Sequence, residues 1–186
     1  MQLRNTDQSY GMIAQFLHWI LAALVFVQIG FGLYAASLPV SLARLQWLSR
    51  HKSLGLAILA LALLRLTWRS MNRAPALPDW IPRWQRRTAA ATHWLLYALL
   101  VLTPLTGWMH ASAAGLSVNW FGLFQVPDLL PKQPGLSALM KSVHIGCVAL
   151  LAFLLLGHVG GALRHAFVLR DEVMHRMLPW QRRRTI

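Results

Sequence analysis

A charge-free run near the start of the chain is the strongest constraint on its fold. From Gln8 to Ala43 the sequence contains no Asp, Glu, Lys or Arg, and about 20 consecutive apolar residues are enough for a helix to cross a bilayer. The whole chain agrees, because 56% of its 186 residues are hydrophobic, only 12% are charged and the mean hydropathy is +0.47. Too little polar surface remains to coat a soluble globule of this size. The sequence therefore predicts a membrane protein.

Four segments predict membrane-spanning helices. Thr88–Ala114 and Ser142–Gly161 are also free of Asp, Glu, Lys and Arg. The run Leu54–Leu64 is short, but it is long enough if the basic residues that flank it lie at the two interfaces. We therefore expect an all-α fold, a four-helix transmembrane bundle that forms one domain over residues 1–186. The expected spans are 12–34, 51–70, 88–112 and 138–165, with an outer loop at 113–136 and a cytoplasmic tail at 166–186.

The basic residues predict the orientation of the bundle. With the N-terminus inside, 13 of the 18 Lys and Arg residues fall on the inner side, and such residues accumulate in cytoplasmic loops. Both termini are therefore expected in the cytoplasm. The net charge of +13 is explained by loops that face anionic headgroups of membrane lipid, so no binding to nucleic acid is expected. The five basic residues expected outside are Arg44, Arg50, Lys52, Lys132 and Lys141.

Four histidines lie inside or at the mouth of these apolar segments, where an imidazole is costly. His144 and His158 are 14 residues apart, which brings the second to within about 40° of the first and about 21 Å further along one helix. His18 and His158 are both expected near the inner ends of their spans, and His51 and His144 are both expected near the outer ends. Two facing pairs predict two bis-histidyl haems. The alternative is interhelical hydrogen bonding or a proton pathway.

The 14-residue interval recurs on the other two helices that carry these histidines. Gly32 follows His18 by 14 residues, and Arg65 follows His51 by the same interval. Gly32 would lie at the depth of the outer haem, where the lack of a side chain lets the macrocycle approach the backbone. Arg65 would lie beside the inner haem and pair with a propionate or a quinone carbonyl, unless it only snorkels at a span end.

The cysteine and the other two histidines of the spans limit which type of haem could be bound and which residues could ligate its iron. Cys147 is the only cysteine, so a Cys-x-x-Cys-His attachment within the chain is excluded and the haem is expected to be of the b type. His93 and His110 are 17 residues apart on the third span, which turns them about 100° from each other. We interpret both as supporting or interface residues and not as ligands.

The order and spacing of several motifs resemble the bacterial cytochrome b561 family, which is related to the cytochrome b subunits of nickel hydrogenases. The resemblance covers nearly the whole chain. It implies a four-helix bundle in the bacterial inner membrane, with two b haems held by the residues that match the four family histidines: His18, His51, His144 and His158. The motifs are His18-Trp19, His51-Lys52-Ser53-Leu54-Gly55, Arg65-Leu66-Thr67-Trp68-Arg69, Pro75, Pro104-Leu105-Thr106-Gly107-Trp108 and Met177-Leu178-Pro179.

The resemblance also implies a function, electron transfer across the inner membrane to quinone. Some members of the family take an electron from superoxide on the periplasmic side and pass it to ubiquinone. A cationic outer face would steer a small anion, although the same residues would also contact lipid headgroups. The alternative is an electron-transfer cytochrome b subunit that links a separate dehydrogenase or hydrogenase, docked on the outer loop, to the quinone pool. A redox-silent transporter or anchor is a third class.

The inner side offers candidate residues for a quinone site. His165 follows His158 by seven residues, two turns further on nearly the same helix face. His165 is the candidate that would donate a hydrogen bond to a quinone oxygen and pass a proton to it. The simpler interpretation is a histidine at the membrane interface. Arg69 and Arg164 complete the candidate set.

Overall fold

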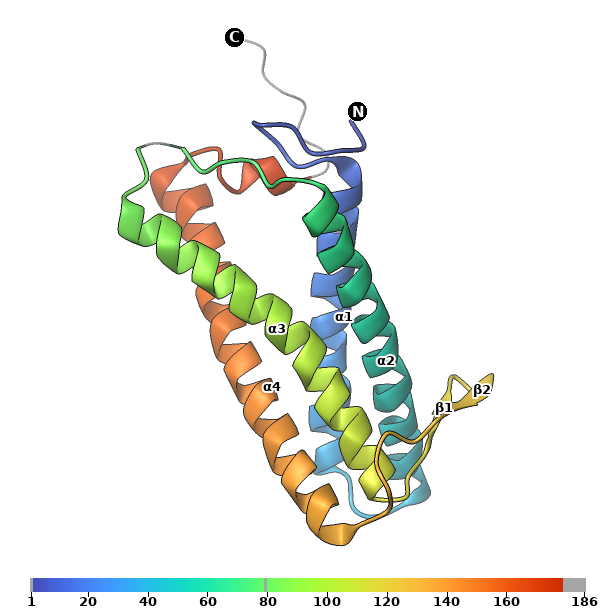
Figure 1. The fold of residues 1–186 in the computed structure, drawn as a ribbon. Coiled ribbons are helices and arrows are strands. Elements are labelled where there is room, and N and C mark those ends of the chain that lie inside the picture. The colour runs from blue at the N-terminus through green and yellow to red at the C-terminus, as the bar shows by residue number, and fades with distance from the viewer. Residues whose placement is uncertain (1, 79, 179–186) are drawn as a thin grey trace.

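Four long helices make up most of the fold, and Figure 1 shows how they are arranged. The computed structural model describes residues 2–78 and 80–178, so the end of the predicted tail, residues 179–186, lies outside the described residues. Each of the four helices is long and apolar enough to cross a membrane, by length and composition. The predicted helical bundle is confirmed. The helices are α1 (Met12–Ser37), α2 (Leu42–Met71), α3 (Arg83–Ala113) and α4 (Pro134–Leu163).

The helices extend beyond the apolar segments from which the spans were predicted. Helix α2 begins at Leu42 because the hydroxyl of Ser41 caps it, accepting a hydrogen bond from the Arg44 amide at 3.3 Å. Helix α4 begins at Pro134, a position where the missing N–H of proline costs nothing. It continues as a π-helical turn, Arg164–Leu169, and a 3₁₀ turn follows at His175–Met177. Hydropathy therefore marks the apolar part of each helix and not its ends.

The start of α1 and the segment that follows α4 lie at the same end of the bundle. Trp19 donates its indole N–H to the carbonyl of Met177 at 2.9 Å, and the Gln15 amide donates to the carbonyl of Arg176 at 3.3 Å. These bonds join the start of α1 to the segment that follows α4. We call this the terminal end and the opposite end the hairpin end. Consecutive helices pack side by side, α1 on α2, α2 on α3 and α3 on α4.

The apolar core lies in the middle of the bundle. Outside it, many large apolar side chains are exposed, among them Phe26, Leu63 and Phe153. Exposed apolar side chains of this kind are suited to contact with lipid. Lipid offers the backbone no hydrogen-bond partner, and within a helix the backbone groups bond to one another. The core residues are Leu21, Val25, Ile58, Leu96, Leu99 and Leu151.

A β-hairpin in the predicted outer loop departs from the all-α expectation. Strands β1 (Val118–Trp120) and β2 (Phe124–Val126) pair antiparallel. Phe121 and Gly122 between them both have positive φ, 49° and 79°, as the central residues of a type I′ turn require. The sequence lacks the Asn-Gly or Asp-Gly signal of that turn. Ser53 of α2 supplies a tertiary contact instead, because its hydroxyl accepts from the Phe121 amide at 3.0 Å and donates to the Asn119 carbonyl at 3.1 Å.

We predict that Ser53→Ala loosens the hairpin. The change leaves the Phe121 amide without its partner, at a cost of about 1–3 kcal/mol. Hydrogen–deuterium exchange of the detergent-purified protein should speed up about tenfold over residues 118–126. Ser142→Ala is the matched control, since among the described residues the Ser142 hydroxyl bonds only the Ala138 carbonyl of its own helix. Equal exchange in both variants would contradict the role of Ser53.

Candidate functional site

The structure brings four histidines together as two pairs at two levels of the bundle. The ring centres of His18 and His158 are 6.1 Å apart, with the ring planes at 77°. Those of His51 and His144 are 6.3 Å apart, at 85°. The first pair joins α1 to α4 at the terminal end, and the second joins α2 to α4 at the hairpin end. These are the pairs proposed from the sequence, and their assignment as iron ligands stays a prediction.

The separation within each pair fits an iron between two imidazoles. A metal–imidazole bond is about 2 Å long and the ring centre lies about 1 Å behind the ligating nitrogen, so two rings on one iron have centres about 6 Å apart. Both observed separations match this value. Two imidazoles in direct contact need not have their ring centres at this separation. The two histidine pairs therefore suit one b haem at each level.

Backbone carbonyls orient the two histidines of the hairpin-end pair. His51 Nδ1 lies 3.2 Å from the Gln28 carbonyl oxygen, and His144 Nδ1 lies 2.9 Å from that of Thr103. A carbonyl can only accept, so Nδ1 carries the proton and the lone pair remains on Nε2, the tautomer common among metal-bound histidines. The Gln28 amide nitrogen also lies 3.3 Å from His51 Nε2, so ligation there requires that amide to move.

Two glycines make room for these two rings. A Cβ at Gly32 would lie 2.9 Å from His51 Cε1, and one at Gly107 would lie 3.0 Å from His144 Cε1. In the structure, Gly32 faces the His51 ring, and the predicted approach of a haem macrocycle to its backbone stays a prediction. The sequence analysis missed the role of Gly107. A signal was present, because Gly107 follows His93 by the same 14 residues.

A third imidazole lies at the level of the terminal-end pair. The ring centre of His93, on α3, is 5.4 Å from that of His158. This is shorter than one iron between two rings needs, so His18 fits better as the partner of His158. His110, the other histidine of α3, lies at the hairpin end, where its Nδ1 is 3.0 Å from the Ser137 carbonyl oxygen. It joins α3 to α4.

Two arginines and a tyrosine form a cationic cluster near the terminal-end pair. Arg65 and Arg69 place their guanidinium carbons 5.8 and 5.4 Å from the ring centre of Tyr97. Arg65 also donates to the Ala14 carbonyl at 2.8 Å. All three residues line a small, open pocket together with Trp68. Within residues 2–78 and 80–178, neither guanidinium has a carboxylate partner, so an anion or a carbonyl from outside the chain suits them.

The structure separates the residues proposed for quinone. Arg69 lines the pocket just described, but His165 and Arg164 do not. His165 Nδ1 lies 2.6 Å from the Asp171 carboxylate, which also accepts from the Val173 amide at 3.0 Å. Arg170 turns the chain back between them with a left-handed φ of 51°. The sequence analysis did not find Asp171, because the reversal that brings it to His165 has no hydrophobic pattern.

Comparison with known proteins gives one family and several relatives. The family model described as prokaryotic cytochrome b561 matches residues 9–180. Cytochrome b561 homolog 2 of Escherichia coli (strain K12) is 29% identical over 183 residues, which cover 96% of this chain and 95% of the relative. Cytochrome b561 homolog 1 of the same organism is 31% identical over 53% of this chain and 55% of its own length. The probable superoxide oxidase CybB of Yersinia pestis is 31% identical over 48% of this chain and 51% of its own length.

We predict that Gly32→Ala disturbs the hairpin-end pair. Alanine normally stabilises a helix over glycine by about 1 kcal/mol, but here the new methyl group would push His51 aside. The measurement is haem per chain with the reduced-minus-oxidised spectrum, and we expect loss or weakening of one haem. Gly30→Ala is the control on the same helix, because no side chain or neighbouring helix in the described part of the chain lies within 4 Å of its Cβ position. Two unaltered haems in Gly32→Ala would count against the placement of His51.

Proposed function

The chain belongs to the prokaryotic cytochrome b561 family, and from that premise we propose that it moves electrons from superoxide to ubiquinone across the bacterial inner membrane. That it is a membrane electron-transfer protein follows from the family and the four apolar helices. The observation that carries the proposal is the pair of imidazole pairs at two levels, each with the spacing of an iron site. Two levels give a route across the membrane, whereas one would not.

Two b haems are the proposed cofactors. His18 with His158, and His51 with His144, would hold the two irons. When bound, each haem supplies a centre that reversibly takes up one electron. The protein holds the rings of the hairpin-end pair by the carbonyls of Gln28 and Thr103.

The proposed orientation places the terminal end in the cytoplasm, because most of the basic residues belong to loops at that end. Two superoxide anions at the periplasmic hairpin end would give up one electron each and leave as O₂. One ubiquinone would take up both electrons and two protons to become ubiquinol. Superoxide as the donor is supported by the similarity to the probable superoxide oxidase of Yersinia pestis. It is also supported by the exposed cations Arg50 and Lys141 at the hairpin end, which would attract a small anion.

The terminal end offers two separate sets of groups for the cofactor and the acceptor. Guanidiniums at membrane depth need a partner, and a haem propionate or a quinone carbonyl would provide one for Arg65 and Arg69. His165 is the proposed proton donor. Because Asp171 binds its Nδ1, Nε2 is left as the ring atom that can exchange a proton.

The alternative is a cytochrome b subunit that serves a separate dehydrogenase or hydrogenase. Superoxide-to-quinone activity in the purified chain alone would favour the first proposal. Activity that appears only with a co-purified redox partner would favour the alternative. The test is a pulse of superoxide added to the chain in liposomes with ubiquinone, followed by the formation of ubiquinol.

We predict two b haems per chain by the pyridine haemochromogen assay. His144→Ala should lose the hairpin-end haem and His158→Ala the terminal-end haem, because each change removes one of the imidazoles that would hold the iron. His110→Ala should keep both, since His110 joins two helices at the hairpin end without belonging to a pair. Two low-spin haems in either of the first two variants would overturn the ligand assignment.

We predict that His165→Ala slows ubiquinone reduction while both haems remain bound. Loss of a positioned proton donor typically costs about 10²-fold or more in rate. The measurement is ubiquinol formation after the haems have been reduced, with haem content determined on the same sample. His175→Ala is the control, an exposed histidine of the same terminal segment. Unchanged turnover in His165→Ala would remove His165 from the site.

A further inference from the structure

The β-hairpin carries an exposed apolar tip that the proposed electron transfer does not use. Between Val118 and Val126 the sequence contains no Asp, Glu, Lys or Arg. At the turn, the side chains of Phe121, Leu123 and Phe124 are 54%, 73% and 56% exposed. A contiguous apolar patch of this kind in a projecting element marks a surface that contacts something other than water.

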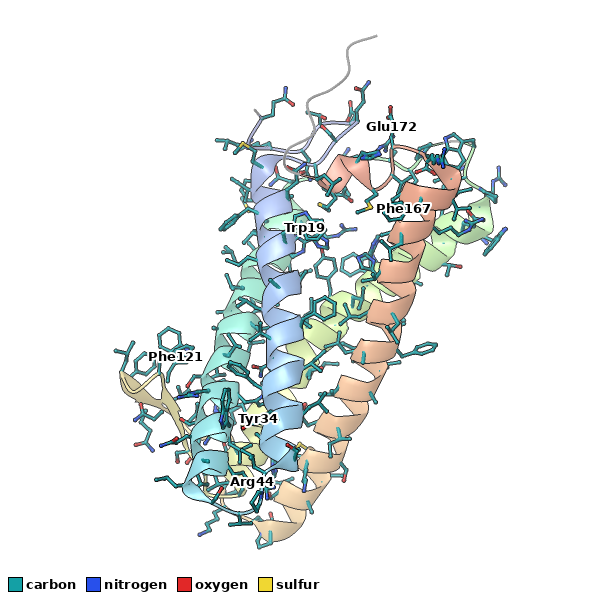
Figure 2. All side chains as sticks on the ribbon, turned by 180° about the vertical axis from the view of Figure 1, so that it is seen from behind. Trp19, Tyr34, Arg44, Phe121, Phe167 and Glu172 are labelled. Carbon is teal, nitrogen blue, oxygen red and sulfur yellow. The ribbon has the colours of Figure 1, made fainter. Side chains whose placement is uncertain are left out.

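The hairpin is attached to the side of the bundle and not above its end. Its anchor, Ser53, bonds both Asn119 and Phe121. Ser53 lies eleven residues after Leu42, the first residue of α2, which is about 16 Å along the helix axis. Figure 2 accordingly shows Phe121 further toward the middle of the bundle than Arg44. The tip therefore lies at about the level of His51, two residues from its anchor, and beside the lipid-facing flank of α2.

Two amides of the tip, and the strands beside it, have hydrogen-bond partners within the chain. Lipid offers no hydrogen-bond partner to an unpaired N–H or C=O group. In the tip, the Phe121 amide bonds Ser53, and the Leu123 amide donates to the Trp120 carbonyl at 2.9 Å. The two strands beside the tip pair with each other. Val118 lies opposite Val126, Asn119 opposite Gln125 and Trp120 opposite Phe124.

Polarity changes along the hairpin in the direction that a membrane interface requires. At the base, the Ser117 hydroxyl donates to the Asp128 carboxylate at 3.0 Å, and the Lys52 ammonium donates to the Leu116 carbonyl at 3.0 Å. Toward the tip, the ring of Trp120 lies 5.1 Å from that of Phe121. Tryptophan is enriched where the headgroups meet the acyl chains. The charged base therefore suits the headgroup region, and the aromatic tip suits the acyl chains next to it.

We propose that the hairpin tip, residues 120–124, inserts into the lipid leaflet at the hairpin end of the bundle. The insertion attaches the loop to the membrane beside α2. Lys52 and Ser53, the two residues that follow His51, then lie between the bundle and the lipid. A soluble redox partner then has no access to the tip. Such a partner would have to dock on the loop segments and helix ends that face the water.

Site-directed spin labelling of the full haem-loaded chain in phosphatidylcholine–phosphatidylglycerol vesicles tests the proposal. In a Cys147→Ala background, which removes the natural thiol, a nitroxide is attached at Leu123→Cys. The matched control is Asp128→Cys at the base of the same hairpin. Collision of each label with oxygen, which concentrates in lipid, is compared with collision with a water-soluble nickel chelate. A second tip label at Phe124→Cys gives an independent reading should the first variant fold poorly.

The expected result is that both tip labels collide mainly with oxygen and are protected from the nickel chelate, while the label at Asp128 shows the reverse. Tip labels that collide with the nickel chelate as readily as the Asp128 label would overturn the proposal and leave the tip free for a soluble partner. Tip labels protected from both reagents would also overturn it, because the tip would then be covered by protein. The outcome does not depend on superoxide or quinone activity.

Discussion

The cost of placing polar groups in an apolar bundle determines how this structure is built. An imidazole or guanidinium at membrane depth needs a partner, and the chain supplies few acidic ones, with 5 Asp and Glu against 18 Lys and Arg. Backbone carbonyls therefore take that role at several positions, as Gln28 does for His51 and Thr103 does for His144. Glycines must face those rings, since any side chain would fill the space. The polar groups inside the bundle thus restrict both the backbone and the residues opposite them.

Two turns of helix separate each polar level from the apolar layer between them. Val25 follows His18 by seven residues, Ile58 follows His51 by seven, and Leu151 lies midway between His144 and His158. Seven residues return a side chain to nearly the same face of a helix. The same faces therefore carry a polar level, an apolar layer and a second polar level. This layer keeps the two proposed redox levels apart and excludes water between them, while the helices that hold both levels remain continuous.

The features predicted from the sequence follow from regular periodicity, and the missed features depend on contacts between distant segments. Charge-free runs were enough for the four helices, because lipid permits little else. Spacing along the helices was enough to propose which histidines meet. The positive φ of Phe121 could not be predicted, since it depends on Ser53, which is 68 residues away. The approach of Asp171 to His165 depends on a chain reversal at Arg170. The contact of His93 with His158 depends on how α3 lies against α4, which the sequence does not contain.

The two levels differ in charge in a way that agrees with the proposed direction of electron flow. At the terminal end, Arg65 and Arg69 lie near the His18–His158 pair without a carboxylate partner in the described part of the chain. At the hairpin end, Arg50 and Lys141 are exposed, so water and salt screen their charge. A fixed positive charge in a low-dielectric region favours the nearby centre that holds the extra electron. The terminal-end centre would therefore be the better acceptor, and an electron that enters from the hairpin end would move toward the side where His165 and Asp171 lie.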